Sequence, residues 1–222
     1  MKHIKRYKIF ESNSPNLPTT RDGVIKVCKR YRIENYTIND DLSIDVDGDV
    51  SLTSNGLEYL PVRFNYVSGS FYCYKNELKS LKGSPQTVGG HFYCHSNKLK
   101  TLEGCPQTVD GFFDCSHNEL KTLEGSPQTV GGNFYCSFNE LRDLEHFPEV
   151  SGSINIEENT VYLLVYTFIE NADSFMIEDF NDYEIVRNRD TVMLDRLQTF
   201  IRDNDLEIPD LEDIKKHYKI IE

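Results

Sequence analysis

One phrase recurs in this chain at a constant spacing, and this repeat restricts the possible folds more than any other feature of the sequence. "GSPQTVGGHFYCHSNKLKTLEG" occupies residues 83–104, "GCPQTVDGFFDCSHNELKTLEG" follows from residue 104, and "GSPQTVGGNFYCSFNEL" begins at residue 125. The period of 21 residues is marked by Asn55, Asn76, Asn97, Asn118 and Asn139. A fixed period of this length is typical of a solenoid, in which each repeat is one coil and only the stacking of coils buries the apolar residues.

The columns of the repeat predict which side chains face the core. Phenylalanine and cysteine stand two residues apart, so on a short strand they point to the same side. We expect burial of Phe71, Phe92, Phe113, Phe134, Cys73, Cys94, Cys115 and Cys136. The leucines two and five residues after each asparagine would fill the turn behind the strand. The asparagine would bond backbone groups that lose their sheet partners where the chain bends. Coils about 4.8 Å apart would form one parallel sheet.

The "PQTV" segments between these strands are expected on the far, convex side of the solenoid. Proline fixes φ and ends local structure there. The following glycine pair, such as Gly89–Gly90, would permit a tight return into the next strand.

The repeat degrades at both ends of the chain, where an open stack of coils needs caps. Early and late coils still place Val50, Leu52, Ile154 and Ile156 inward, with Asn159 following its neighbour by 20 residues. The predicted organisation is a basic leader and linker (1–21), an N-terminal helix and β-hairpin cap (22–49), the solenoid (50–159) and a helical C-terminal cap (160–222). In the last segment, "VYLLVYTFIE", "TVMLDRLQTFIRD" and "DLEDIKKHYK" are expected to be helices, with helix starts near Asp190 and Asp210.

Charge is distributed unevenly along the 222 residues. Residues 1–35 carry nine Lys/Arg against three Asp/Glu, residues 36–156 carry eight against 16, and residues 157–222 carry seven against 17, giving −12 overall. This acidic body would repel a phosphate backbone, so general nucleic-acid binding is not expected, and basic protein partners fit better.

No apolar run approaches the roughly 18 residues of a membrane span. "MKHIKRYKIF" lacks the apolar stretch of a signal peptide, so we expect a cytoplasmic protein with reduced cysteines.

The pattern F-x-C-x-x-N-x-L-x-x-L resembles the leucine-rich repeat, with phenylalanine and cysteine in two of its apolar slots. Together with "NYTINDDLSIDVDGDVSL" and the opening "MKHIKRYKIFESN", it looks like leucine-rich-repeat proteins encoded by tailed bacteriophages. The resemblance implies an α/β solenoid with a curved parallel sheet, a binding role in the bacterial host cytoplasm and no catalytic residues. By analogy, the partner would be a host protein such as a defence factor.

Three groups of residues suggest chemistry, but each has a simpler structural interpretation. A column of four buried cysteines spreads its sulfurs along a line, whereas zinc needs four converging ligands. "DVDGD" (Asp45, Asp47, Asp49) matches half of a calcium loop without the closing glutamate. His91, His95 and His117 lie near Cys115, but an inward thiol is not reachable by a substrate. We therefore expect no enzyme, no metal and no cofactor, and we expect Cys105 in its "PQTV" turn to be an exposed odd thiol.

Residues on the outward side of the strands are the better candidates for function, because we expect them to line the concave surface that many solenoids use for binding. In the central coils it carries mainly aromatic groups: Tyr72, Tyr74, His91, Tyr93, His95, Phe112, Asp114 and Tyr135. Aromatic side chains are enriched in protein interfaces, but they also stabilise sheets as cross-strand ladders. Phe112 and Asp114 carry more weight because they break their columns. The favoured function is binding of a protein or peptide; the alternatives are a structural component of a phage particle and a small-ligand binder where the solenoid meets a cap.

Overall fold

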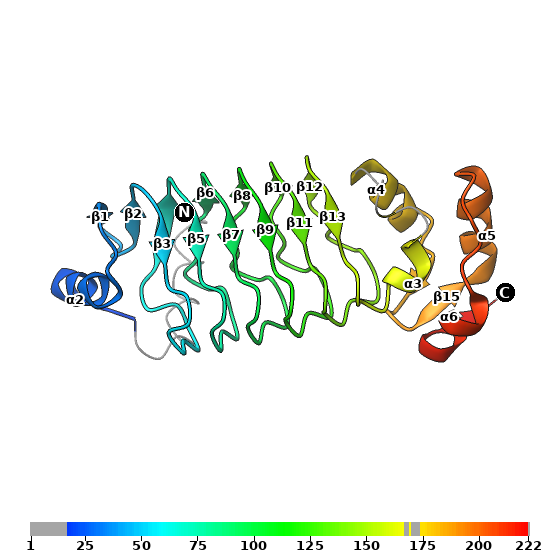
Figure 1. The fold of residues 1–222 in the computed structure, drawn as a ribbon, viewed down its shortest axis with the longest axis horizontal. Helices are drawn as coiled ribbons and strands as arrows, with labels where there is room; N and C mark the ends of the chain where they lie inside the picture. The colour runs from blue at the N-terminus through cyan, green and yellow to red at the C-terminus, as the bar shows by residue number, and fades with distance from the viewer. Residues whose placement is uncertain (1–16, 167–168, 170–173, 222) are drawn as a thin grey trace, which may run out of the picture.

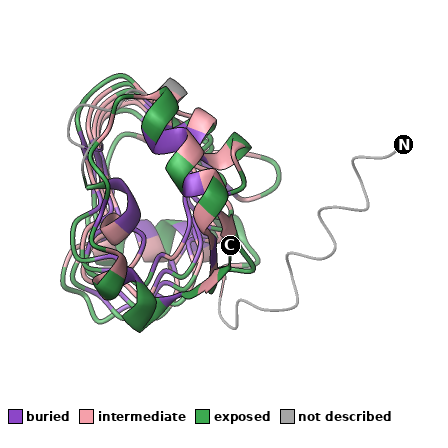
Figure 2. Ribbon diagram, turned by 90° about the vertical axis from the view of Figure 1, so that its right-hand side faces the viewer, coloured by how far each residue is buried: buried purple, intermediate pink, exposed green. Residues whose placement is uncertain are grey.

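A computed structural model shows a parallel β-solenoid of about five turns with helices at both ends (Figure 1). It describes residues 17–166, 169 and 174–221, so most of the predicted leader and linker lies outside the described residues. Viewed from one end, the coils lie over one another (Figure 2). Their buried side chains join one apolar core that also includes residues of the terminal helices.

Two sheets run along the solenoid, one more than the sequence predicts, and their strands are parallel except for the first strand of the second sheet. The first has six strands: β3 (Val50–Ser51), β5 (Phe71–Tyr72), β7 (Phe92–Tyr93), β9 (Phe113–Asp114), β11 (Phe134–Tyr135) and β13 (Ile154–Asn155). The second has seven: β1 (Tyr36–Ile38), β2 (Ile44–Val46), β4 (Phe64–Val67), β6 (Thr87–Val88), β8 (Thr108–Val109), β10 (Thr129–Val130) and β12 (Glu149–Val150). The "PQTV" segments are therefore strands as well as bends, because the valine of each is buried in the core and pairs in register with its neighbours.

The inward columns are confirmed. The phenylalanine and cysteine side chains of the four central coils are fully buried, and so are the leucines behind them. Phenylalanine rings stack along the core with centroids 5.4 Å apart for Phe92 and Phe113 and 5.5 Å apart for Phe71 and Phe92. Val50, Leu52, Ile154 and Ile156 fill the same slots in the outer coils.

The predicted role of the asparagines is also confirmed. Asn97 is representative: its amide nitrogen donates to the carbonyls of Cys73 (3.1 Å) and Cys94 (3.0 Å), and its amide oxygen accepts the Leu78 N–H (3.0 Å). One side chain thus satisfies backbone groups in two adjacent coils where the sheet ends. Asn159 does the same despite its shorter spacing, whereas Asn55 at the first coil is exposed and, within the described part of the chain, its side chain bonds only the Thr53 carbonyl.

The glycine pairs between the two sheets are required for a different reason from the expected one. Gly89 and Gly90 do not have positive φ. A Cβ on Gly89 would instead clash with the Ser68 carbonyl oxygen, and one on Gly90 would lie 2.8 Å from the Gly69 carbonyl carbon. Close approach of successive coils, not backbone freedom, excludes a side chain at this corner.

The N-terminal elements match their prediction. Helix α2 (Arg21–Tyr31) buries Val24 and Cys28 in the common core, and the Thr20 side chain accepts the Gly23 N–H at its start (3.1 Å). β1 and β2 then pair as an antiparallel hairpin.

The C-terminal segment is not purely helical, contrary to the prediction. Its helices are α3 (Tyr162–Val165), α4 (Ser174–Asp182), α5 (Leu194–Asp203) and α6 (Leu211–His217), and its three-stranded sheet comprises β14 (Val186–Arg187), β15 (Thr191–Met193) and β16 (Lys219–Ile221). The expected helix start at Asp190 is wrong because β15 follows it. Asp210 does cap a helix, accepting the Glu212 N–H at 2.8 Å.

Polar contacts join this segment to the last full coil. Asn181 of α4 donates to the Leu144 carbonyl (2.8 Å), and the Tyr218 hydroxyl donates to the Arg142 carbonyl (2.8 Å). Within the described ranges, no helix is both long and apolar enough to cross a membrane.

Candidate functional site

The eight candidate residues lie together on the outward side of the six-stranded sheet. The register pairs Tyr72 with Tyr93, Tyr93 with Asp114, and Asp114 with Tyr135 across β5, β7, β9 and β11. All eight side chains are half-buried. We call this set the outward aromatic face; it comprises Tyr72, Tyr74, His91, Tyr93, His95, Phe112, Asp114 and Tyr135.

Much of the burial comes from rings stacking on rings. Tyr72 and Tyr93 are nearly parallel with centroids 5.4 Å apart, and Tyr74 and His95 are nearly parallel at 4.5 Å. Such ladders stabilise a sheet whether or not a partner binds. Within each pair the facing ring surfaces cover one another, so ring edges, tyrosine hydroxyl groups and only the outermost ring faces remain to contact a partner. This arrangement suits hydrogen bonding and edge contacts with a polypeptide better than extended stacking of sugars or bases.

A second column, just before the strands, consists of hydrogen-bond acceptors. Each side chain in it accepts the backbone N–H of the equivalent residue in the next coil: Asp49 from Ser70 (2.7 Å), Ser70 from His91 (3.0 Å) and His91, through Nδ1, from Phe112 (2.8 Å). His91 must therefore carry its proton on Nε2 when neutral. Asn133 resumes the pattern by accepting from Ser153 (2.9 Å).

Phe112 interrupts that column, since its ring has no acceptor for the N–H of Asn133. The ring instead contacts His91 at 4.6 Å and the edge of Tyr135 at 6.2 Å between centroids. The scaffold thus forgoes a hydrogen bond to place a half-buried apolar ring on this face. Phe112 is the clearest departure from what the fold itself requires.

Asp114 interrupts the column of tyrosines. Its Oδ1 accepts the Ser116 N–H (2.9 Å), which fixes the orientation of the carboxylate. Ser116 is buried and small, where the preceding coil has His95. At these two positions the coil of β9 therefore carries smaller side chains than the preceding coil.

Two aromatic residues beside this face were not among the predicted binding residues, although the sequence analysis considered one of them, His117, as a catalytic candidate. His117 and Phe138 stack with centroids 4.4 Å apart, and Phe138 is 49% exposed. Both occupy the left-handed turn position directly before the asparagine, at φ 54°. A large side chain there is unusual. The available signal was that they break a column otherwise filled by Lys75 and Ser96.

Burial and neighbouring charges shift the pKa values of two residues on the face, Tyr93 and His95. Burial raises the pKa of Tyr93, with further contributions from Tyr72, Asp114 and Tyr135. Burial lowers the pKa of His95; Asp114 opposes that shift, and Lys75 and His117 add to it. His95 is therefore mainly uncharged near neutral pH, so Asp114 faces no cationic imidazole from it.

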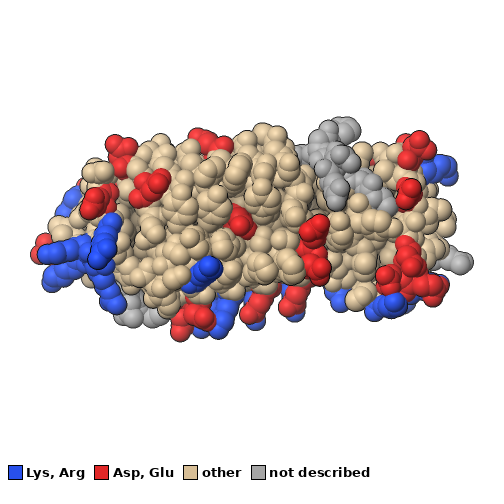
Figure 3. Space-filling view, viewed as in Figure 1, with Lys and Arg blue, Asp and Glu red and all other residues tan. Residues whose placement is uncertain are grey.

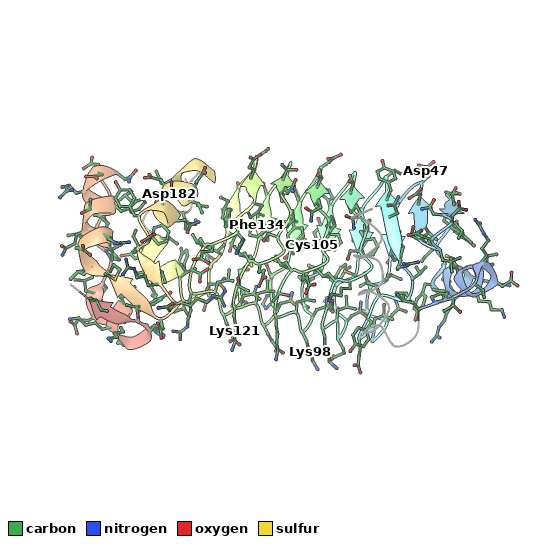
Figure 4. The ribbon with its side chains drawn as sticks, turned by 180° about the vertical axis from the view of Figure 1, so that it is seen from behind. Asp47, Lys98, Cys105, Lys121, Phe134 and Asp182 are labelled. Atoms are coloured by element: carbon green, nitrogen blue, oxygen red, sulfur yellow. The ribbon has the colours of Figure 1, made fainter. Side chains whose placement is uncertain are left out.

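Several ion pairs link adjacent coils outside this face. Glu58 and Lys79 pair across coils at 2.7 Å, Lys121 and Glu140 pair at 3.3 Å, and Lys98 pairs with Glu77. Lys98 and Lys121 project from the lower turns in Figure 4. In Figure 3 the middle of the molecule is mostly uncharged. These exposed pairs are screened by water and contribute little to stability.

The aspartates of "DVDGD" have structural roles that link adjacent coils. The Asp45 and Asp47 carboxylates accept hydrogen bonds from Asn65 (2.7 Å) and Ser68 (2.9 Å) of the next coil. Within the described ranges, no cluster of His, Cys, Asp and Glu could hold a metal ion.

The prediction of an exposed Cys105 was wrong: the residue is only 3% exposed, and its thiol donates to the Gly125 carbonyl (3.0 Å). Burial raises the pKa of Cys105 and those of Cys73, Cys94 and Cys115, so these thiols are poor nucleophiles.

A pocket of about 660 Å³ lies where α4 meets the last coils, lined among others by Gln128, His146, Phe147, Ile177 and Asp182. A second of about 310 Å³ lies beside it and includes Asp143, a buried carboxylate whose Oδ2 is 3.2 Å from Arg189 Nε. Both volumes are within the range of ligand sites.

No family model, curated protein or solved structure matches the chain significantly. Its candidate site therefore has to be interpreted from its own geometry.

Proposed function

We propose that the protein is a non-enzymatic binding module that holds a protein or peptide on the outward aromatic face. The observation that carries the proposal is Phe112, because its half-buried ring replaces a hydrogen-bond acceptor that the scaffold uses in the coils on both sides. A ring in that place contributes contact area, and aromatic residues of this kind dominate the energetics of protein interfaces. The ring edges and hydroxyls of the stacked pairs supply partners for a peptide backbone.

Selection from a random peptide library displayed on ribosomes tests this function. The wild type is compared with a triple variant, Tyr72→Ser, Tyr93→Ser and Tyr135→Ser, whose fold is checked by circular dichroism. Peptides that bind the wild type and not the variant support the proposal. Peptides that bind both equally would place the site elsewhere, and an absence of binders would favour a purely structural role in an assembly.

The partner and setting follow from the resemblance to leucine-rich-repeat proteins of tailed bacteriophages. We propose that the solenoid is of that type, that the terminal elements act as its caps, and that the protein binds a host factor in the bacterial cytoplasm. Affinity capture from bacterial lysate, again with the triple variant beside the wild type, tests this part. A protein retained by the wild type alone would support it.

The pocket beside α4 favours a second candidate function, binding of a small ligand where the solenoid meets the C-terminal segment. Its volume of about 660 Å³ and its mixture of Phe147, Ile177 and polar groups fit such a site. Thermal-shift screening against a metabolite library would test it, with Ile177→Lys as the variant expected to lose any hit.

A further inference from the structure

The interrupted column of tyrosines leaves the position of one ring vacant. In register across β5, β7, β9 and β11 the column contains Tyr72, Tyr93, Asp114 and Tyr135. Tyr72 covers one face of the Tyr93 ring at 5.4 Å, and the coil on the other side of Tyr93 carries Asp114 where a third ring would stack. We call the space over Asp114, beside the uncovered face of the Tyr93 ring, the vacant layer. Since coils follow one another about every 4.8 Å, this layer has room for one planar group.

Aromatic groups surround this layer. Phe112 flanks it within the same coil, where it contacts His91 at 4.6 Å, and His117 flanks it at the turn, where it stacks on Phe138 at 4.4 Å. The neighbouring coil contributes Tyr135, whose hydroxyl accepts a hydrogen bond from the Asn133 amide at 2.5 Å. The layer is thus bordered by rings on several sides.

The Asp114 carboxylate forms the floor of the layer, and only one of its two oxygens accepts a hydrogen bond from a described residue. Among the described residues, the only hydrogen bond of the Asp114 carboxylate uses Oδ1, toward Ser116 N–H. No described Lys or Arg forms an ion pair with it. A half-buried carboxylate fixed in orientation and lacking a cation is suited to bind one.

We infer that this position binds an arginine side chain of the protein partner, with the guanidinium plane stacked on the free face of Tyr93 and its N–H groups donating to the Asp114 carboxylate. The inference rests on the proposed binding function. Arginine fits better than lysine, because its planar group continues the stack of rings and offers a fork of donors that matches a carboxylate. The charge of the chain is complementary, since residues 36–156 carry 16 acidic against eight basic side chains.

Nuclear magnetic resonance titration with a capped Gly-Ser-Arg-Ser-Gly peptide tests the inference, beside the same peptide containing citrulline, the neutral isostere of arginine. We expect shifts centred on Tyr93, Asp114 and Ser116, and about tenfold tighter binding of the arginine peptide, since each factor of ten corresponds to one modest charged contact. Asp114→Asn, which keeps the Oδ1 acceptor, should abolish that preference. Asp110→Asn removes the same charge from an exposed position of the same coil and should preserve it.

Equal binding of the arginine and citrulline peptides, no binding of either, or an equal loss in the Asp110→Asn control would overturn the inference. The library selection separates this failure from failure of the proposed function. The selected peptides could require Tyr72, Tyr93 and Tyr135 but lack arginine and still bind the Asp114→Asn variant. That result would support the aromatic face as a binding site and contradict the inference that it binds arginine. A selection that yields no peptide whose binding depends on this face would contradict both the proposed binding function and the arginine inference.

Discussion

The two faces of the six-stranded sheet are built from alternate residues of the same strands, yet they follow different rules. The inward face repeats phenylalanine and cysteine in each central coil without change, because each ring stacks on the phenylalanine of the adjacent central coil. The outward face starts as a regular ladder at Tyr72 and Tyr93 and then changes at Phe112 and Asp114. Packing imposes identity on the first face, so departures on the second identify residues that the fold does not demand.

The largest expected effect separates two adjacent residues of β7. Phe92→Ala should lower the free energy of unfolding by about 4 kcal/mol, because it opens a cavity in a fully buried stack. Tyr93→Ala should cost only about 1 kcal/mol, since it removes a half-exposed cross-strand contact. Urea denaturation followed by circular dichroism measures both, with Phe92→Leu as a milder inward variant. Similar losses for Phe92→Ala and Tyr93→Ala would contradict the division between the faces.

The asparagine column provides a second contrast, between the middle of the stack and its first coil. Asn97→Ala should destabilise by about 3 kcal/mol, since it leaves the Cys73 and Cys94 carbonyls and the Leu78 N–H without their partner. Asn55→Ala should cost well under about 1 kcal/mol, because that side chain is exposed and bonds one carbonyl. Urea denaturation measures both variants. A large loss of unfolding free energy in Asn55→Ala would show that the contribution of these asparagines does not depend on their burial.

Periodicity explains which parts of this architecture were predictable. The inward columns and the asparagine ladder follow from spacing alone, because one residue type in one place has to meet the same neighbours in every coil. The second sheet was missed because proline and glutamine precede each Thr-Val pair and disguise a strand. Burial of Cys105 was missed because turns are usually exposed. The outward positions could be placed on a face, but the interaction of His91 Nδ1 with Phe112 N–H and the turn conformation of Phe138 depend on how coils abut.

Replacing the residue that breaks the tyrosine column sharpens the comparison between scaffold and partner. Asp114→Tyr restores the ring expected from the repeat, gaining a stack on Tyr93 and losing the bond to Ser116 N–H. These contributions are of similar size, so the free energy of unfolding should change by less than about 1 kcal/mol. Binding of the arginine peptide should be lost. Denaturation and the peptide titration together check this, and a strongly destabilised Asp114→Tyr would mean that the carboxylate serves the fold.

The smallest expected effect concerns the pKa of His95, which depends in part on the negative charge of Asp114. Burial lowers the pKa of His95, so its imidazole should titrate below the ordinary value of about 6.5. Because the folded-state pKa is depressed, the stability associated with neutral His95 is present above about pH 6.5 and is lost as pH falls through the folded-state pKa.

Asp114→Asn should lower the pKa of His95 further, since the carboxylate is the group that favours its protonation, against Lys75 and His117. Nuclear magnetic resonance titration of the imidazole measures the midpoint in both proteins, with Asp110→Asn as the matched control. An unchanged midpoint in Asp114→Asn would mean that water screens the carboxylate from its neighbours. The electrostatic attraction between Asp114 and a guanidinium group would then also be weak. The size of the pKa shift of His95 therefore indicates how strongly Asp114 can attract an arginine side chain.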